Sequence, residues 1–300
     1  MSSQKEIFSD IKEKFERAYH LVDDESKSDP PSDPFRSHYA ARTILEDLVQ
    51  SLRETIENDD NFLYKVFLGF ACRDLGRIYV FTEEPFTGEK YLKECLQLVD
   101  PYKLKKEAII AYIGASNEMG IVECNRGNHK EALEHLKRSE DIYEQFQYLA
   151  DSPMSITDLF GPADEVEKGK GPKEIAKIYT LCTYYMAQYC NLTLKRQLES
   201  DDYDPIDWAL NAATLSQYYI GPNLFKEARH HLAAATLIMT EFEGKMVTDE
   251  MTLEAKEAIK ESFNHRFADI ARCWAKYGLA LLNASRERLM ADDDVEKVTK

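Results

Sequence analysis

The sequence contains few residues that break helices, with 12 glycines and 10 prolines among 300 residues. A β-sandwich or β-barrel needs many turns built from Gly and Pro, and no alternation of apolar and polar residues persists along the chain. Apolar residues instead recur at spacings of three and four positions almost everywhere. Because this is the period of one helix face, the pattern predicts an all-α protein.

Long hydrophobic runs and paired cysteines are also missing. The N-terminal segment MSSQKEIFSDIKEKF has no apolar core of the kind that a signal peptide carries, and no stretch of ~18 uncharged apolar residues could span a membrane. The six cysteines stand singly, with no CxxC pair, at Cys72, Cys95, Cys124, Cys182, Cys190 and Cys273. We therefore expect buried free thiols and a cytoplasmic protein, because the cytosol keeps thiols reduced.

Basic residues are in the minority, since 38 Lys and Arg stand against 54 Asp and Glu, which gives a formal net charge of −16. Binding to nucleic acid or to an anionic membrane needs clustered Lys and Arg, so we expect neither partner. The acidity permits a basic protein partner, which long-range attraction would steer towards the chain. Alternatively, the acidity only keeps the chain soluble.

Catalytic and metal-binding motifs are absent as well. The segment GKGP (169–172) lacks the leading Gly and the Ser or Thr of a phosphate-binding loop, and neither HExxH nor GxSxG occurs. His129 and His135 fall on different sides of a predicted helix, and the adjacent His230 and His231 diverge, so neither pair is expected to hold a metal. The many carboxylates include no distinguishable acid–base pair. We predict no enzyme, no cofactor and no metal site.

The helical pattern is interrupted at places that have a physical cause. Pro101 after Asp100 suits the first turn of a helix but not its interior, and Asp204 can cap a helix that opens at Pro205. We predict helices at residues 5–21, 36–57, 61–81, 86–98, 103–126, 129–148, 173–199, 205–220, 223–242 and 252–290. The expected loops lie at 23–34, 151–172 and 243–250.

These elements predict an organisation in five segments. They are an N-terminal helix with an acidic, proline-containing linker (1–34), a first set of helix pairs (35–150), a long loop (151–172), a second set of helix pairs (173–290) and an acidic flexible tail (291–300). A connection as long as the loop is either functional or disordered.

A repeated arrangement of small and large residues occurs three times. In each copy a small residue is followed, at the same offsets, by a second small residue, a leucine and a third small residue. The copies are Gly76, Gly88, Leu92 and Cys95; Gly120, Ala132, Leu136 and Ser139; and Ser216, Ala228, Leu232 and Ala235. This spacing is typical of tetratricopeptide repeats, in which the small residues let two antiparallel helices approach closely.

The copies are spaced more widely than in a standard repeat. Gly76 and Gly120 are 44 positions apart, whereas the standard repeat has about 34 residues, so we expect elongated helices or connections. A stack of such helix pairs is an α-solenoid whose first helices line a concave binding surface.

A few polar residues in the second set of helix pairs have no evident packing role. Most tyrosines there are expected to pack between layers, but Tyr185 and Gln188 are three positions apart and would share one side of their helix. Gln197 near the end of that helix, and Thr214 and Gln217 on the next, are not explained by packing either. We predict that these five residues contact a partner.

Several longer blocks resemble the kinesin-binding protein (KIF-binding protein) family. They are FRSHYAARTILEDL (35–48), the hairpin 117–143, TLKRQLE (193–199), PIDWALNAATLSQYYI (205–220), FKEARHHLAAA (225–235) and IARCWAKY (270–277). The resemblance covers essentially the whole chain and about the N-terminal half of the family's usual length. It implies a right-handed tetratricopeptide-like α-solenoid that is not an enzyme, clasps the motor domain of certain kinesins and keeps it off microtubules.

The resemblance also implies a cytoplasmic, cytoskeleton-associated role in axonal transport and neuronal development. We expect a monomer, with tubulin-associated proteins as further candidate partners. The family positions that touch the motor match Tyr185, Gln188, Gln197 and Thr214. Family members carry an additional hairpin between the blocks that hold Gln188 and Gln197, whereas here one continuous helix, 173–199, is expected.

A general tetratricopeptide adaptor is the alternative, with a chaperone tail or a cytoskeletal factor as its partner. An adaptor that clamps a carboxylate would need Lys, Asn and Arg side chains converging from successive first helices. Arg73, Arg77 and Asn117 provide only part of that set.

Overall fold

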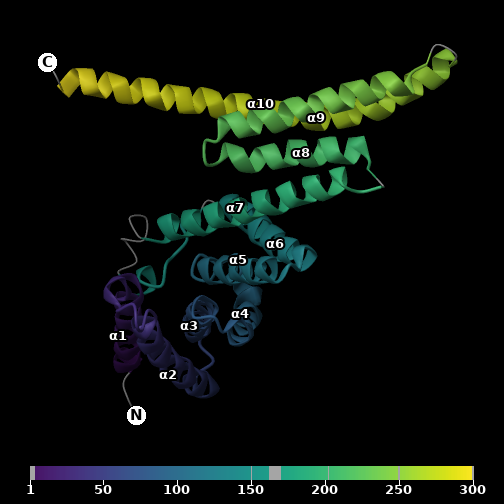
Figure 1. Cartoon of the computed structure of the whole chain (residues 1–300). Helices are drawn as coiled ribbons and strands as arrows, with labels where there is room; N and C mark the ends of the chain where they lie inside the picture. Colours follow the sequence, from purple (N-terminus) through teal and green to yellow (C-terminus); the bar gives the residue numbers. More distant parts are fainter. Residues whose placement is uncertain (1–3, 150, 162–169, 202, 249–250, 299–300) are drawn as a thin grey trace. The chain divides into compact units, whose positions relative to one another are not determined.

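The computed structural model describes residues 4–149, 151–161, 170–201, 203–248 and 251–298. Within these residues the chain is built from α-helices and short 3₁₀ helices joined by turns, and no β-strand is present (Figure 1). The predicted all-α fold with tetratricopeptide-like helix pairs is confirmed. The right-handed sense of the solenoid stays a prediction.

The chain divides into two compact units, Met1–Cys182 (unit 1) and Thr183–Lys300 (unit 2). Unit 1 contains α1 (Gln4–Asp23), η1 (Glu25–Ser28), α2 (Arg36–Asn58), α3 (Phe62–Phe81), α4 (Pro85–Val99), η2 (Asp100–Tyr102), α5 (Ile109–Arg126), α6 (His129–Gln147) and η3 (Asp158–Phe160). Unit 2 contains α8 (Pro205–Ile220), α9 (Phe225–Met246) and α10 (Leu253–Val298). The helix α7 (Gly171–Leu198) begins in unit 1 and ends in unit 2.

The division between the units falls inside α7 rather than in the segment 151–172. Ile175, in the first turns of α7, belongs to the buried core of unit 1, whereas Ala187 and Leu194 further along belong to the core of unit 2. Within unit 1 the segment 151–172 carries η3, and residues 162–169 lie outside the described part. The continuous helix predicted for 173–199 is present as α7.

Several helix ends differ from the prediction. The helix expected from residue 103 begins only at Ile109, because residues 103–108 form turns. Long-range contacts hold this segment, since the Tyr102 ring packs on the Phe62 ring at 4.8 Å and the Lys105 ammonium lies 4.4 Å from the Phe62 ring centroid. No local pattern encodes such contacts with α3.

Two helices in unit 2 are longer than predicted. The helix α9 continues to Met246, so the expected loop 243–250 begins later, and its residues 249–250 lie outside the described part. The helix α10 runs to Val298 and thus through most of the segment assigned to a tail. The predicted start of α8 is confirmed, because the Asp204 side chain accepts a hydrogen bond from the backbone N–H of Ile206 at 2.8 Å.

The small residues of the first repeat copy are packed against each other where α3 and α4 meet. A Cβ atom added to Gly88 would lie 2.6 Å from the Gly76 carbonyl oxygen, and one added to Gly76 would lie 2.6 Å from the Leu92 side chain. The second copy repeats this geometry, since a Cβ on Gly120 would lie 2.7 Å from the Leu136 side chain. The predicted role of these residues in close helix approach is confirmed.

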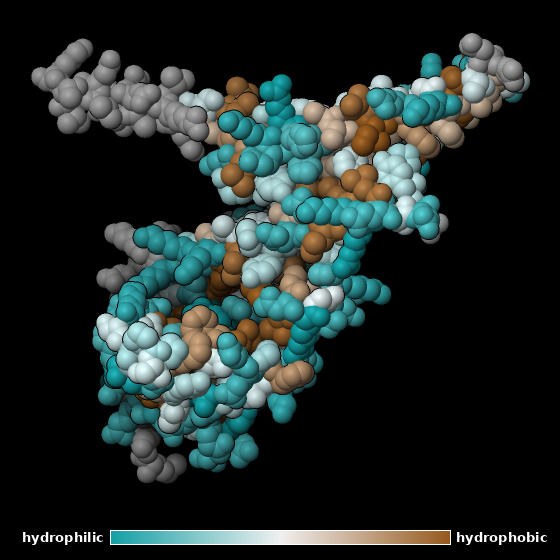
Figure 2. All heavy atoms as spheres, in the orientation of Figure 1, coloured by the Kyte–Doolittle hydropathy of each residue, from teal (hydrophilic) through white to brown (hydrophobic). Residues whose placement is uncertain are grey.

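The third repeat copy forms the centre of unit 2. Ser216 of α8 and the residues Ala228, Leu232 and Ala235 of α9 are completely buried, and α8 packs along α9 (Figure 1). On the face shown in Figure 2, apolar residues along α9 and α10 are interspersed with hydrophilic ones. The same repeat geometry therefore supports both units.

Candidate functional site

The end of α7 and the helix α8 present a line of polar side chains in unit 2. The Asn211 amide nitrogen donates a hydrogen bond to the Gln197 side-chain oxygen at 3.2 Å, and the Trp208 indole nitrogen donates to the Leu194 carbonyl at 3.2 Å. These two bonds join α7 to α8 and orient Gln197, which is partly exposed. Gln197 is therefore held in place by α8 rather than left mobile at a helix end.

Thr214 and Gln217 continue this line along α8. Residues 211, 214 and 217 are three positions apart and so share one side of the helix. The Thr214 hydroxyl donates to the Leu210 carbonyl at 3.0 Å and its side chain is exposed, while the partly buried Gln217 amide donates to the Ser216 hydroxyl at 3.0 Å. We call Gln197, Asn211, Thr214 and Gln217 the α8 polar stripe.

Tyr185 and Gln188 lie elsewhere on α7. The exposed Gln188 amide donates to the Tyr184 hydroxyl at 3.0 Å, and the Tyr184 ring meets the Tyr185 ring edge-on at 5.5 Å. Nine residues separate Gln188 from Gln197 on one continuous helix, which corresponds to two and a half turns at about 3.6 residues per turn. The two glutamines consequently point to opposite sides of α7.

Among the five predicted site residues, Gln197 is joined through Asn211 to the side of α8 that also carries Thr214 and Gln217. Tyr185 and Gln188 lie apart from them on α7, and the role of all five in partner binding stays a prediction. Sequence reasoning missed Asn211, although its position three residues before Thr214 could have indicated that it shares the same side of α8. It also missed Tyr184 as the hydrogen-bond partner of Gln188.

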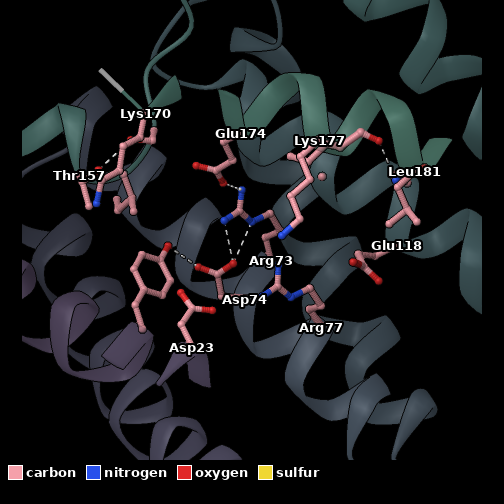
Figure 3. Close-up of a pocket in the computed structure, with 16 residues that line it drawn as sticks. Asp23, Arg73, Asp74, Arg77, Glu118, Thr157, Lys170, Glu174, Lys177 and Leu181 are labelled. Atoms are coloured by element: carbon pink, nitrogen blue, oxygen red, sulfur yellow. Dashed lines mark hydrogen bonds and ion pairs between the residues drawn. The ribbon is translucent and has the colours of Figure 1, made fainter. Parts of the chain in front are cut away.

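A pocket of about 280 Å³ lies in unit 1 and is lined by charged residues (Figure 3). Its walls come from α1, α3, α5, the segment 155–157 and the beginning of α7. The Arg73 guanidinium is buried there and donates to Asp74 at 2.9 Å and to Glu174 at 3.0 Å. The Tyr19 hydroxyl donates to the second oxygen of Asp74 at 2.8 Å. This network ties α1, α3 and α7 together.

The environment shifts the pKa of several groups in this pocket. Burial alone would lower the pKa of Arg73, but Asp74 and Glu174 more than offset it and hold this pKa well above its ordinary value. Burial, together with the negative charge of Asp74, raises the pKa of Tyr19. Burial also raises the pKa of the Glu118 carboxyl, although Arg77 and Arg73 oppose that shift. Arg73 is thus charged, and its guanidinium is already bound by Asp74 and Glu174.

Among the described residues, no group of three or more His, Cys, Asp or Glu side chains is arranged to hold a metal ion. All six cysteines are free, of which Cys72, Cys95 and Cys182 are buried and the others partly exposed. In the part of the chain that the structure describes, no helix combines the length and the apolar character needed to cross a membrane.

Comparison with known proteins gives consistent matches. The family model described as "KIF-1 binding protein C terminal" matches residues 206–300. The KIF-binding protein of Drosophila melanogaster is 49% identical over 316 aligned positions, which cover 97% of this chain and 53% of that protein. The protein of the same name from Gallus gallus is 36% identical, with 92% of this chain and 49% of that protein covered.

A solved structure, the cryo-EM structure of KIFBP core, is 30% identical and covers 93% of this chain and 91% of that chain, with a TM-score of 0.39. The chain spans about half the length of the curated relatives that it matches. The Drosophila alignment is also longer than the 300 residues of this chain, so that relative has residues with no counterpart here. On the extent and identity of these matches, the chain belongs to the KIF-binding protein family.

Proposed function

We propose that the chain binds the motor domain of kinesins without catalysing a reaction, and that it thereby keeps the motor from attaching to microtubules. The names of its relatives support a kinesin as the partner. The proposed setting is the cytoplasm, at the cytoskeleton, where such binding would regulate microtubule-based transport, including transport in axons.

The α8 polar stripe is the observation that carries this proposal. Its amide and hydroxyl groups donate and accept hydrogen bonds without carrying charge, and the bond between Gln197 and Asn211 orients these two side chains before any partner arrives. Binding of a partner therefore costs less side-chain entropy than it would if these side chains were mobile. Thr214, exposed in the middle of α8, is the residue whose loss should matter most.

The charge of the chain supplies the proposed mechanism of inhibition. Tubulin is acidic, so the face of a kinesin that binds tubulin is basic, and a chain with a net charge of −16 can compete for that face. Binding should then weaken steeply as salt is added, because screening reduces attraction between exposed charges. An affinity that does not change with salt would contradict this mechanism.

A pull-down of isolated kinesin motor domains by the full chain tests the proposal. Thr214→Ala should lower the affinity about fivefold, as expected for the loss of one hydrogen bond, and Gln197→Ala/Thr214→Ala should lower it further. Thr240→Ala is the matched control, because the Thr240 hydroxyl of α9 is also exposed and also donates to the carbonyl four residues before it, at 2.9 Å.

The outcomes separate the candidates. Retention of motor domains by the wild type and the control, with a loss in the Thr214 variants, supports the proposal. If no motor domain is retained by the wild type, the chain is better described as an adaptor for another protein. The charged pocket of unit 1 is the specific observation that favours this second candidate.

A further inference from the structure

Cationic side chains in the pocket of unit 1 remain available to a ligand, and Arg77 and Lys177 are the two that lie next to each other. Arg77 of α3 and Lys177 of α7 both line the pocket and are exposed, and neither side chain forms an ion pair or hydrogen bond with a described residue. Figure 3 shows the Lys177 side chain reaching from α7 towards Arg77, with Glu118 beside them. Arg73, in contrast, is occupied by Asp74 and Glu174.

The buried Asn117 provides a second, independent indication. Its amide nitrogen donates to the Ile178 carbonyl at 3.3 Å, which fixes the orientation of the amide group. Its side-chain oxygen is buried and accepts no hydrogen bond from any described residue, although Asn117 is only 2% exposed and lines the pocket. Buried polar atoms are nearly always hydrogen-bonded, so this oxygen is suited to accept a bond from a ligand's N–H group.

These three side chains come from successive odd-numbered helices. Arg77 lies on α3, Asn117 on α5 and Lys177 on α7, and these helices form one side of unit 1 at the pocket. The sequence offered Arg73, Arg77 and Asn117 as part of a carboxylate clamp. The structure removes Arg73 from this set and adds Lys177, which completes the combination of Lys, Asn and Arg.

We propose that the pocket binds a carboxylate of a partner polypeptide, held by Arg77 and Lys177, while a neighbouring backbone N–H of that polypeptide donates to the Asn117 side-chain oxygen. The adjacent cations Arg77 and Lys177 and the unpaired acceptor of Asn117 match a carboxylate next to a peptide group. The carboxylate can be a chain terminus or an Asp or Glu side chain. This site is separate from the α8 polar stripe and does not depend on kinesin binding.

The charges around Glu118 add a pH dependence. Arg77, Arg73 and Asp74 act directly on Glu118. The other titratable groups that line the pocket are Tyr19 and Asp23 of α1, Lys170, and Glu174 and Lys177 of α7. Because burial raises the pKa of Glu118, this residue takes up a proton at a higher pH than an ordinary carboxylate does. Repulsion between Glu118 and a bound peptide carboxylate then decreases, so the affinity should increase as the pH falls, as long as the peptide carboxylate stays ionised.

Fluorescence polarisation with labelled peptides and the full chain tests the site. The probes are an alanine peptide that ends in Asp with a free terminal carboxylate, the same peptide with an amidated terminus, and an amidated peptide with Asn in place of Asp. Arg77→Ala and Lys177→Ala should each weaken binding of the first probe about tenfold. Lys173→Ala is the matched control, because Lys173 is exposed on α7 but does not line the pocket.

The probes also identify the source of the carboxylate. Binding lost on amidation assigns the site to a chain terminus, and binding kept by the amidated Asp peptide assigns it to a side chain. The proposal is overturned if none of the acidic probes binds at millimolar concentration, or if Arg77→Ala and Lys177→Ala leave binding unchanged. Stronger binding of a lysine-terminated amidated peptide, or affinity that falls on acidification, would also overturn it. Circular dichroism of the variants verifies that they fold.

Discussion

The helices α3 of unit 1 and α9 of unit 2 are buried in different ways. In α3 every residue from Val66 to Gly76 is buried, so the helix is covered all round. In α9 the buried residues are Ala228, Leu232, Ala235 and Met239, which form a single stripe at helical spacing. Polar groups within this buried part of α3 must consequently pair inside the protein, as Arg73 and Asp74 do, whereas polar groups on the open side of α9 can remain at the surface.

The polar groups that the two units offer to a partner differ accordingly, charged ones in unit 1 and neutral ones in unit 2. A charge buried among helices is stable only if it is paired. Unit 1 accordingly pairs the buried Arg73 with Asp74 and Glu174, and other cations line the same pocket without such partners. Unit 2 presents neutral amide and hydroxyl groups along α8.

Removing the Arg73 side chain should cause the largest loss of stability among the changes considered. Arg73→Met would leave Asp74 buried without its cation and should lower the free energy of unfolding by about 3 kcal/mol. Arg53→Met is the control, because Arg53 makes a similar two-pronged contact with Glu94, at 2.6 and 2.9 Å, on the exposed surface. It should cost about 1 kcal/mol at most. Urea unfolding measures both, and equal losses would contradict the importance of burial.

Adding a methyl group where α3 and α4 approach closely should cause the next largest loss of stability. In Gly88→Ala the new methyl group meets the Gly76 carbonyl oxygen, part of the backbone, and should destabilise the chain by about 1–3 kcal/mol. Gly278→Ala, in α10 of unit 2, meets nothing within 4 Å and should instead stabilise its helix by about 0.5–1 kcal/mol. Urea unfolding measures both variants. If their midpoints shift in the same direction, the close approach of α3 and α4 at Gly88 does not explain the need for glycine there.

Removing the N-terminal cap of α8 should cause the smallest of the three losses of stability, and this one lies in unit 2. Asp204→Ala leaves the N–H of Ile206 without its side-chain acceptor and should cost about 1 kcal/mol. The nearby exposed Asp201 forms no such cap, so Asp201→Ala should leave the unfolding midpoint nearly unchanged. Because α8 carries Thr214, motor binding measured on the same samples would show whether fraying of its start reaches the α8 polar stripe. Equal midpoints for the two variants would exclude a stabilising cap.

Local signals were enough to predict most of the helices and their pairing. Apolar spacing, the Asp204 cap and the offsets around Gly88 and Ala132 all depend on residues within one helix or one helix pair. The late start of α5 could not be predicted in this way, because contacts of Tyr102 and Lys105 with Phe62 of α3 hold the preceding turns.

The candidate sites were less accessible to sequence reasoning. The sequence selected Gln197 and Thr214 because packing did not explain them, but it could not reveal that Asn211 connects the two helices. The opposite orientation of Gln188 and Gln197, in contrast, follows from the continuous helix 173–199 that the sequence had predicted.

The sequence by itself determined that this chain is helical, acidic and built from repeated helix pairs, because period, charge and small-residue spacing are properties of neighbouring positions. Only the tertiary structure decided which polar groups are still available for a partner. Arg73 and Lys177 look alike as isolated cations, yet packing surrounds Arg73 with Asp74 and Glu174 and leaves Lys177 at the mouth of the pocket. A side chain's availability depends on residues that are distant in the sequence, and folding alone brings those residues together.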